Sequence, residues 1–91
     1  MKYHYRLHAL QRMFEREIPP EEVEACIESG EVIEPYPEDS PCPSFLKLHH
    51  SDRGVLHVVY AECEEDERIV ITAYRPDPEK WDKGFRKRRR S

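Results

Sequence analysis

The hydrophobic period of the chain changes once, at Gly30, and this change sets the order of its secondary structure. Before Gly30, apolar side chains recur at three- or four-residue spacing, namely Leu7, Leu10, Met13 or Phe14, and Ile18. This spacing predicts an amphipathic helix over residues 4–17. The segment "IPPEEVEACIESGE" predicts a second helix, because prolines and acids suit a helix start and glycine suits its end.

After Gly30 the pattern is that of β-strands. The runs "EVIEPYP", "SFLKLHH", "GVLHVVYAE" and "ERIVITAYR" are separated by proline-rich or turn-forming segments. They predict an α+β fold in which two N-terminal helices pack on a four-stranded antiparallel sheet, with the last two strands central. The irregular segment "PDPEKWDKGF" comes next, and its Trp81 is expected to pack back on the domain. The pattern leaves open whether Tyr3 and Tyr5 belong to the first helix or to an extra strand.

Length and charge indicate one small domain with a basic tail. The chain has 91 residues, enough for a single modest core, which we place at residues 1–82. Residues 83–91 hold six of its fifteen basic residues, so residues 1–82 carry nine basic against nineteen acidic groups, a net charge of -10. Such a tail can bind polyanions, fold against the acidic body or stay mobile.

Several classes of protein are disfavoured by what the sequence lacks. No apolar run approaches the roughly 18 residues of a membrane span, and the N-terminus does not resemble a signal peptide, so we expect a cytoplasmic protein without membrane contact. Cys26, Cys42 and Cys63 are odd in number and never spaced as CxxC, which argues against a disulfide framework and a zinc site. No GxSxG turn is present for a serine hydrolase. We expect no cofactor and no metal.

His57 is the most unusual residue of the strand "VLHVVYA", because a buried imidazole needs hydrogen-bond partners. Strand alternation places Val55, His57, Val59 and Ala61 on one face. A register with His57 opposite Thr72 would add Val70, Thr72 and Tyr74 to that face, whereas a slip of one residue would surround His57 with aliphatic side chains. His57 is therefore either an acid, base or phosphate donor, or a structural core histidine.

A second candidate constellation lies on the first predicted helix. His8, Arg12 and Arg16 are spaced i, i+4, i+8 and form one polar stripe. Three donors on one face could hold successive phosphate oxygens. The alternative is a solvated helix face, as the neighbouring Glu15 suggests. A metal site from His49, His50 and His57 is disfavoured, since adjacent strand residues point to opposite faces.

The ordered segments "HALQRMFEREI", "GEVIEPYPED", "PSFL", "LHVVYA" and "IVITAYRPDPEKW" resemble the domain-of-unknown-function family 4258 (DUF4258). The resemblance covers about residues 4–90. It implies a toxin-like protein related to RelE and MqsR-type ribonucleases, with a RelE/barnase-like fold, paired with a small zinc-finger or helix-turn-helix antitoxin. The polar positions of the family fall on His8, Arg12, Arg16, Ser44, His57, Thr72 and Tyr74. This chain departs from the family at "DRGVLH", where Val55 replaces an expected proline.

The resemblance leads to the hypothesis of a metal-independent endoribonuclease in which the RNA 2′-hydroxyl is the nucleophile. The expected catalytic residues are His57 for general acid or base work, His8 for a second proton transfer, Arg12 and Arg16 for phosphate stabilisation, and Tyr74 for orientation. The expected substrate-binding residues are Ser44, Thr72, Arg75, Arg86 and Arg88. The alternative is a non-catalytic module that binds protein or nucleic acid.

Overall fold

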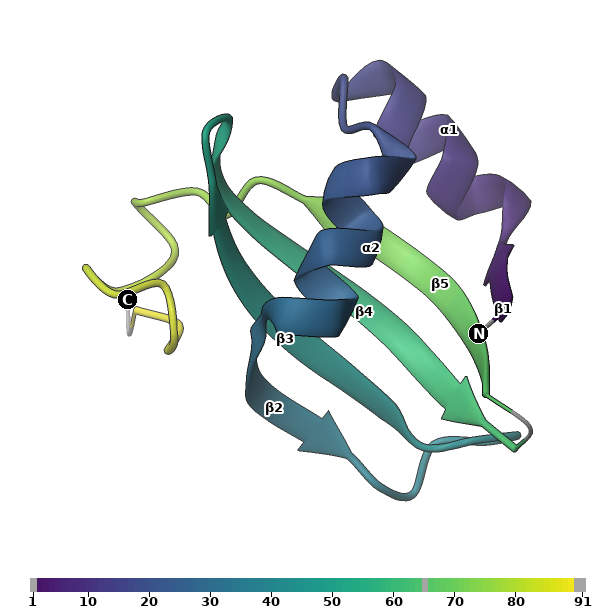
Figure 1. Ribbon diagram of the computed structural model, residues 1–91. Helices are drawn as coiled ribbons and strands as arrows, with labels where there is room; N and C mark the ends of the chain where they lie inside the picture. The colour runs from purple at the N-terminus through teal and green to yellow at the C-terminus, as the bar shows by residue number, and fades with distance from the viewer. Residues whose placement is uncertain (1, 65, 90–91) are drawn as a thin grey trace.

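The computed structural model describes residues 2–64 and 66–89 and shows two helices beside a five-stranded mixed sheet (Figure 1). In chain order the elements are β1 (Lys2–Tyr5), α1 (Leu7–Glu15), α2 (Pro20–Ser29), β2 (Glu31–Tyr36), β3 (Ser44–Ser51), β4 (Gly54–Cys63) and β5 (Glu67–Tyr74). The strand order in the sheet is β1-β5-β4-β3-β2. The α+β class is confirmed, and β4 and β5 are interior strands as expected.

The prediction of four antiparallel strands is wrong by one strand. Residues Lys2–Tyr5, which the sequence assigned in part to the first helix, form β1, and β1 pairs in parallel with β5. The tyrosine side chains explain this arrangement, because Tyr3 donates a hydrogen bond to Glu28 of α2 and Tyr5 donates one of 2.6 Å to Glu24. Both contacts link the strand to a helix that is distant in sequence, and helical periodicity carries no signal for such contacts.

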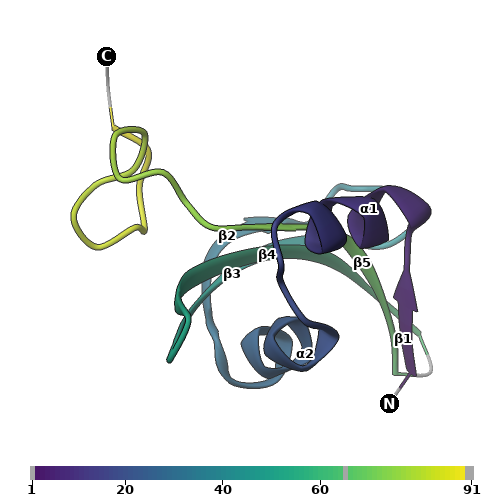
Figure 2. The same ribbon diagram turned by 90° about the horizontal axis from the view of Figure 1, so that it is seen from above.

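The main core lies between the sheet and the two helices. Figure 2 shows the sheet curving around α2, while the C-terminal segment leaves on the opposite side. The buried apolar members of this core are Ala9, Met13, Ile18, Val23, Cys26, Ile27, Leu56, Val58, Tyr60, Val70 and Ala73. Alternation along β4 supplies Leu56, Val58 and Tyr60 to this layer and directs His57 to the opposite face.

The first helix buries only part of the apolar set that its periodicity suggested, since Met13 and the following Ile18 are buried. Ala9 and Met13 are its buried residues, whereas Leu7, Leu10 and Phe14 are exposed to solvent. The small Ala9 lets the helix lie close to the sheet, and the contacts of α1 are mainly with β5. The helix therefore has two apolar faces, and only one of them is covered by the described residues of the chain.

The register between β4 and β5 differs from the expected one by two residues. His57 is paired with Tyr74, and Val59 is paired with Thr72. Thr72 and Tyr74 thus share the face of His57, as expected. The register shifts between Val59 and Tyr60, so that Tyr60 pairs with Val70 and Val70 joins the helix-facing core. One extra residue in β5 forms a β-bulge and accounts for this register shift. Beyond a bulge, residues that would have pointed to one face of the sheet point to the other, which is why Val70 faces the helices.

Residues 75–89 fold back over the free face of the sheet instead of extending away. Trp81 is buried, as expected, and forms an isolated bridge with Arg88. The backbone N–H of Asp82 bonds the carbonyl of Lys87 at 2.8 Å, and that of Arg89 bonds the carbonyl of Lys80 at 2.8 Å. Of the expected basic tail, residues 83–89 lie in this folded segment, whereas residues 90 and 91 lie outside the described residues.

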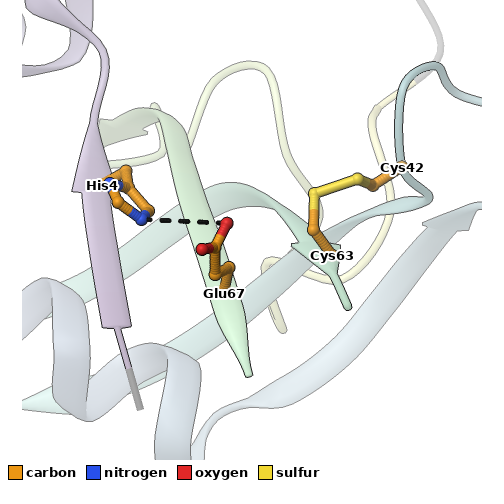
Figure 3. The surroundings of a disulfide bond; sticks show 4 residues. All are labelled: His4, Cys42, Cys63 and Glu67. Carbon is orange, nitrogen blue, oxygen red and sulfur yellow. Dashed lines mark ion pairs between the residues drawn. A yellow bond between two sulfur atoms is a disulfide. The ribbon is translucent and has the colours of Figure 1, made fainter. Parts of the chain in front are cut away.

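The prediction that the cysteines are unpaired is wrong for two of the three. Cys42 and Cys63 form a disulfide with a Cα–Cα distance of 5.3 Å, which joins the segment before β3 to the end of β4 (Figure 3). In the same view, Nε2 of His4 on β1 lies 3.9 Å from Oε2 of Glu67 on the neighbouring strand β5. Cys26 remains a buried free thiol whose pKa burial raises to about 12. The number and spacing of the cysteines did not indicate this disulfide, because the antiparallel pairing of β3 with β4 is what brings Cys42 and Cys63 together.

Within residues 2–64 and 66–89, no helix is long and apolar enough to cross a membrane.

Gly30 is required for space and not for an unusual backbone angle. Its φ of -76° is open to any residue, but a Cβ there would lie 2.4 Å from the carbonyl oxygen of Cys26 and 2.8 Å from that of Leu48. We therefore expect Gly30→Ala to lower the free energy of unfolding by about 1–3 kcal/mol through overpacking. Urea unfolding checks this, with Ser29→Ala, at the exposed neighbouring position, as the control. Equal stability of both variants would contradict the close approach.

The disulfide closes a loop with a sequence separation of 21 residues, so its loss should widen the unfolded ensemble. We expect the double variant Cys42→Ser, Cys63→Ser to lose about 3 kcal/mol of unfolding free energy. Reductant should destabilise the wild type by a similar amount in urea unfolding and leave the double variant unchanged. A wild type that does not respond to reductant would show that the two thiols are not paired in solution.

Candidate functional site

A cationic pocket opens where the end of α1, the end of β5 and the C-terminal segment meet. Its volume is about 420 Å³, and its described lining residues are Arg16, Tyr74, Arg75, Asp77, Lys80, Trp81 and Arg88. Four of these seven side chains are positively charged and one is negatively charged. In a chain with a formal charge of -4, this is a local reversal of sign. Such a concentration of positive charge attracts anions.

The edge of β5 positions the first cation of the pocket. Pairing between β1 and β5 runs only to Val70, so the backbone of Ala73 further along is not used by β1. Arg16, which ends α1, donates a hydrogen bond of 2.9 Å from Nη1 to the carbonyl oxygen of Ala73. This bond uses one donor of the guanidinium group and fixes its position, while the fork geometry leaves further donors for a ligand.

A buried carboxylate holds the second cation. Arg75 forms a bidentate ion pair with Glu22 of α2, in which Nη2 lies 2.8 Å from Oε1. The pair lowers the pKa of Glu22 below its ordinary value, mainly through the hydrogen bonds from Arg75. Part of the charge of Arg75 is thus compensated, and its geometry is rigid. The less constrained positive charges of the pocket are Lys80 and Arg88.

Arg88 is placed by an aromatic ring. Its guanidinium carbon lies 4.7 Å from the centroid of the Trp81 ring, which is a cation–π distance. On the same segment, Arg86 pairs with Glu31 of β2 at 2.9 Å, and the Nε of Arg89 bonds the carbonyl of Pro78 at 2.9 Å. The Arg86–Glu31 pair holds the C-terminal segment against β2, and the other two contacts fold the segment on itself, so that Arg88 stays at the pocket.

His57 lies beneath the pocket and not in its lining. Its exposed fraction is 0%, and both ring nitrogens have partners, with Nδ1 3.2 Å from the Tyr74 hydroxyl and Nε2 2.9 Å from the carbonyl oxygen of Phe85. A carbonyl only accepts, so Nε2 carries the proton and Nδ1 accepts from Tyr74. The ring also meets Trp81 edge-on at 4.5 Å. Burial lowers the pKa of His57, and the Phe85 carbonyl partly opposes this effect.

Tyr74 connects the buried imidazole to the pocket. Its hydroxyl donates to His57, and burial raises the pKa of Tyr74, with the positive charge of Arg88 opposing the shift. The phenol is therefore neutral near pH 7. Asp77 is the one carboxylate among the described lining residues, and its Oδ1 accepts a 2.8 Å hydrogen bond from the backbone N–H of Glu79. The pocket thus combines cations, a neutral hydroxyl and a carboxylate.

The structure brings four of the ten expected site residues to this pocket, namely Arg16, Tyr74, Arg75 and Arg88. Thr72 is half-buried on the same sheet face and does not line the pocket. His8 is exposed on α1, and Arg12 pairs with Glu15 at 3.4 Å. The three residues of the predicted polar stripe are therefore separated in the structure. Helix α1 has only nine residues, and Arg16 at its end is the one residue of the three that reaches the edge of β5.

The two remaining expected residues lie elsewhere. Ser44 is buried at the start of β3, opposite Ala61, and donates a hydrogen bond to Asp39. Arg86 is occupied by Glu31. Sequence reasoning did not select Asp77, Lys80 or Trp81 as site residues. The available signal was their position in "RPDPEKW", directly after the strand that carries Tyr74.

No group of three or more His, Cys, Asp or Glu side chains in the described part of the chain is arranged to hold a metal ion. The donors of the pocket are chiefly nitrogen cations, and these bind anions and repel metal ions. The chemistry open to the pocket is therefore recognition of an anionic group together with proton transfer to its carboxylate and from its ammonium group.

The buried state of His57 has a consequence for stability. Because its folded-state pKa is lowered, the unfolded chain takes up a proton below about pH 6.5 that the folded chain does not. The free energy of unfolding should fall as the pH drops from about 6.5 toward the folded-state pKa, by at most about 1.4 kcal/mol per pH unit. His57→Gln should lack this component in urea unfolding across pH 5–7. Identical slopes for both proteins would contradict a neutral buried imidazole.

Comparisons with known proteins give one match. No curated protein and no solved structure matches the chain. A family model matches residues 5–75, which include both helices and all the strands from β2 to β5. The chain therefore belongs to the family described as "Domain of unknown function (DUF4258)".

Proposed function

We propose that the protein binds the phosphate backbone of RNA at the cationic pocket and cleaves it without a metal ion, as a toxin-type endoribonuclease. The observation that carries the proposal is the convergence of Arg16, Lys80 and Arg88 around one hollow that also contains Tyr74 and Asp77. Arginine and lysine are the side chains that proteins use to hold phosphate. RNA supplies its own nucleophile, so a small site suffices.

The proposed reaction is a transesterification within the RNA. The carboxylate of Asp77 accepts the proton of the 2′-hydroxyl, and the 2′-oxygen attacks the adjacent phosphorus. Arg16 and Arg88 stabilise the negative charge of the phosphorane. The bond to the 5′-oxygen breaks, and the ammonium group of Lys80 gives that oxygen a proton. The products are a 2′,3′-cyclic phosphate and a 5′-hydroxyl. The Tyr74 hydroxyl, whose proton is donated to His57, orients the substrate by accepting a hydrogen bond from a ribose hydroxyl.

His57 has an indirect role in this proposal. Its complete burial and its two engaged nitrogens remove it from direct contact with substrate, so its contribution is to position Tyr74. His8 and Arg12 are likewise outside the described lining of the pocket. The proposed relationship to RelE and MqsR-type toxins, and the proposed small zinc-finger or helix-turn-helix antitoxin partner, rest on the sequence resemblance.

A second candidate function is a non-catalytic module that uses the same pocket to bind an anionic partner. One specific observation favours it, namely that the pocket contains no accessible imidazole among its described lining residues. Imidazole is the side chain most often used for proton transfer near neutral pH. Both candidates share the binding step and differ in the chemical step.

Binding and chemistry can be tested with separate variants. Arg16→Ala and Arg88→Ala should each weaken binding to single-stranded RNA about 10-fold and reduce the slope of log K against log salt by about 0.7 per lost contact. Arg53→Ala, which removes a positive charge from the exposed β3–β4 turn, is the matched control and should bind like the wild type. Equal losses for Arg53→Ala and Arg16→Ala would show that binding reflects overall charge.

Cleavage should depend on the proton-transfer groups. We expect Asp77→Asn to lower the cleavage rate at least about 100-fold with binding retained, because general acid–base groups contribute that much or more. Lys80→Met should lower the cleavage rate by a similar factor beyond its effect on binding, since Lys80 also contributes positive charge to the pocket. Asparagine preserves the acceptor that bonds the N–H of Glu79. Product analysis should show 2′,3′-cyclic phosphate ends. Binding by the wild type with intact RNA would reject the nuclease and leave the binding module.

A further inference from the structure

A hollow beside the disulfide opens both of its cysteines to solvent. Its volume is about 470 Å³, and Cys42 and Cys63 are among its lining residues. Each of the two is partly exposed, so a small molecule can reach the bond between them without unfolding the chain. The hollow and the cationic pocket lie at opposite ends of the sheet, because Cys63 ends β4 whereas Tyr74 pairs with His57 near the start of that strand.

The wall of this hollow is acidic. Besides the two cysteines and two prolines, its described lining consists of Glu62, Glu64 and Glu67, and it includes no lysine or arginine. Glu67 is the direct partner of Cys63 across β4 and β5 (Figure 3), which places their Cβ atoms about 5 Å apart. Negative charge therefore stands close to the sulfur atoms.

Neighbouring basic side chains compensate this charge only in part. The Nε of Arg68 lies 3.2 Å from Oε1 of Glu62, but Arg68 is shared with Glu28, whose Oε2 lies 3.0 Å from its Nη1. His4 lies 3.9 Å from Glu67 and carries a charge only when protonated. Three carboxylates thus face the hollow with less than three compensating charges.

The remaining thiol of the chain does not take part in chemistry at the disulfide. Cys26 is 0% exposed, and its Sγ donates a hydrogen bond to the carbonyl oxygen of Lys47. Burial raises the pKa of Cys26 to about 12, so the group stays protonated near neutral pH. Because only a thiolate attacks a disulfide, the nucleophile must come from outside the chain.

We propose that the Cys42–Cys63 disulfide is a thiol–disulfide exchange site whose acidic wall selects thiols with a positive charge beside the sulfur and excludes anionic thiols. The observation that carries the proposal is the presence of both cysteines and three carboxylates in one open hollow. This inference is independent of the proposed ribonuclease activity.

The exchange is a two-electron reduction by two external thiols. The first thiolate bonds to one sulfur of the pair, the S–S bond breaks, and the other sulfur leaves with the electron pair and takes a proton from water. A second thiolate attacks the sulfur of the first reagent, and the second protein sulfur leaves and is protonated in the same way. The protein gains two thiols, and the reagent is oxidised to its own disulfide.

Selectivity arises because the attacking group brings negative charge into the acidic hollow. An ammonium group beside the thiolate offsets this charge, whereas a sulfonate adds to it. The Debye length is about 30 Å at 0.01 M ionic strength, so every carboxylate of the hollow acts on the reagent, and it falls to about 3 Å at 1 M, where the effect is screened.

Reduction kinetics of the folded, full-length protein test the proposal, with cysteamine as the cationic thiol and 2-mercaptoethanesulfonate as the anionic one. Rates are calculated per thiolate concentration and divided by the rates of the same reagents with an uncharged small disulfide, so that intrinsic reactivity cancels. The corrected rate should be about 10-fold higher for cysteamine at roughly 0.01 M salt and nearly equal for both reagents at roughly 1 M. Alkylation and mass determination should show two new thiols per chain.

Two triple variants separate the local charge from the overall charge. The first, Glu62→Gln with Glu64→Gln and Glu67→Gln, should lose most of the preference at low salt because the repelling carboxylates are gone. The matched control removes three acids from exposed positions elsewhere and should keep the preference; its changes are Glu21→Gln, Asp52→Asn and Glu79→Gln. Circular dichroism checks that both variants are folded.

Three results would overturn the proposal. Equal corrected rates for the two thiols at low salt would show that the acidic wall does not act on the reagent. An equal loss of preference in both triple variants would assign the effect to overall charge. Two thiols that react with an alkylating agent before any reductant is added, or a disulfide that is reduced only in the unfolded chain, would remove the exchange site itself.

Discussion

The structure depends on the burial of β4 on both of its faces. Leu56, Val58 and Tyr60 face the helices, and His57 faces the other way, and all four are buried. A strand that is apolar on both sides must be covered on both sides, because exposed apolar surface costs about 25 cal/mol per Å². The helices cover one face. In a chain this short, the remaining cover comes from the C-terminal segment, through Trp81.

The need to cover the second face of β4 also creates the candidate site. The C-terminal segment has little regular structure of its own, so it depends on side-chain contacts such as those of Arg86 with Glu31 and of His57 with the Phe85 carbonyl. Where this segment meets the end of β5, it brings Lys80 and Arg88 beside Arg16. The family match ends at residue 75, whereas Asp77, Lys80, Trp81 and Arg88 lie beyond it. A large part of the pocket is therefore built by the segment after the matched region.

Particular residues show how far sequence reasoning could reach. The change of period at Gly30 located both helices and the four later strands, because amphipathic periodicity reflects a local requirement for one buried face. The expected site included Arg16, Tyr74, Arg75 and Arg88, which do meet in one pocket. His57 was expected to be either chemical or structural, and its engaged ring nitrogens favour the structural interpretation. Asp77 and Lys80 carried no periodic signal and were missed.

Sequence by itself determined the α+β class, the order of helices and antiparallel strands and the buried position of Trp81, because each arises from local patterns of apolar and turn-forming residues. Tertiary structure decided the parallel pairing of β1, the bulge that moves Val70 to the helix-facing core, the joining of Cys42 to Cys63 and the outward face of Leu7 and Phe14. These features depend on contacts between residues far apart in the chain. The free energy of such contacts arises only when the elements pack together, so local periodicity does not encode them.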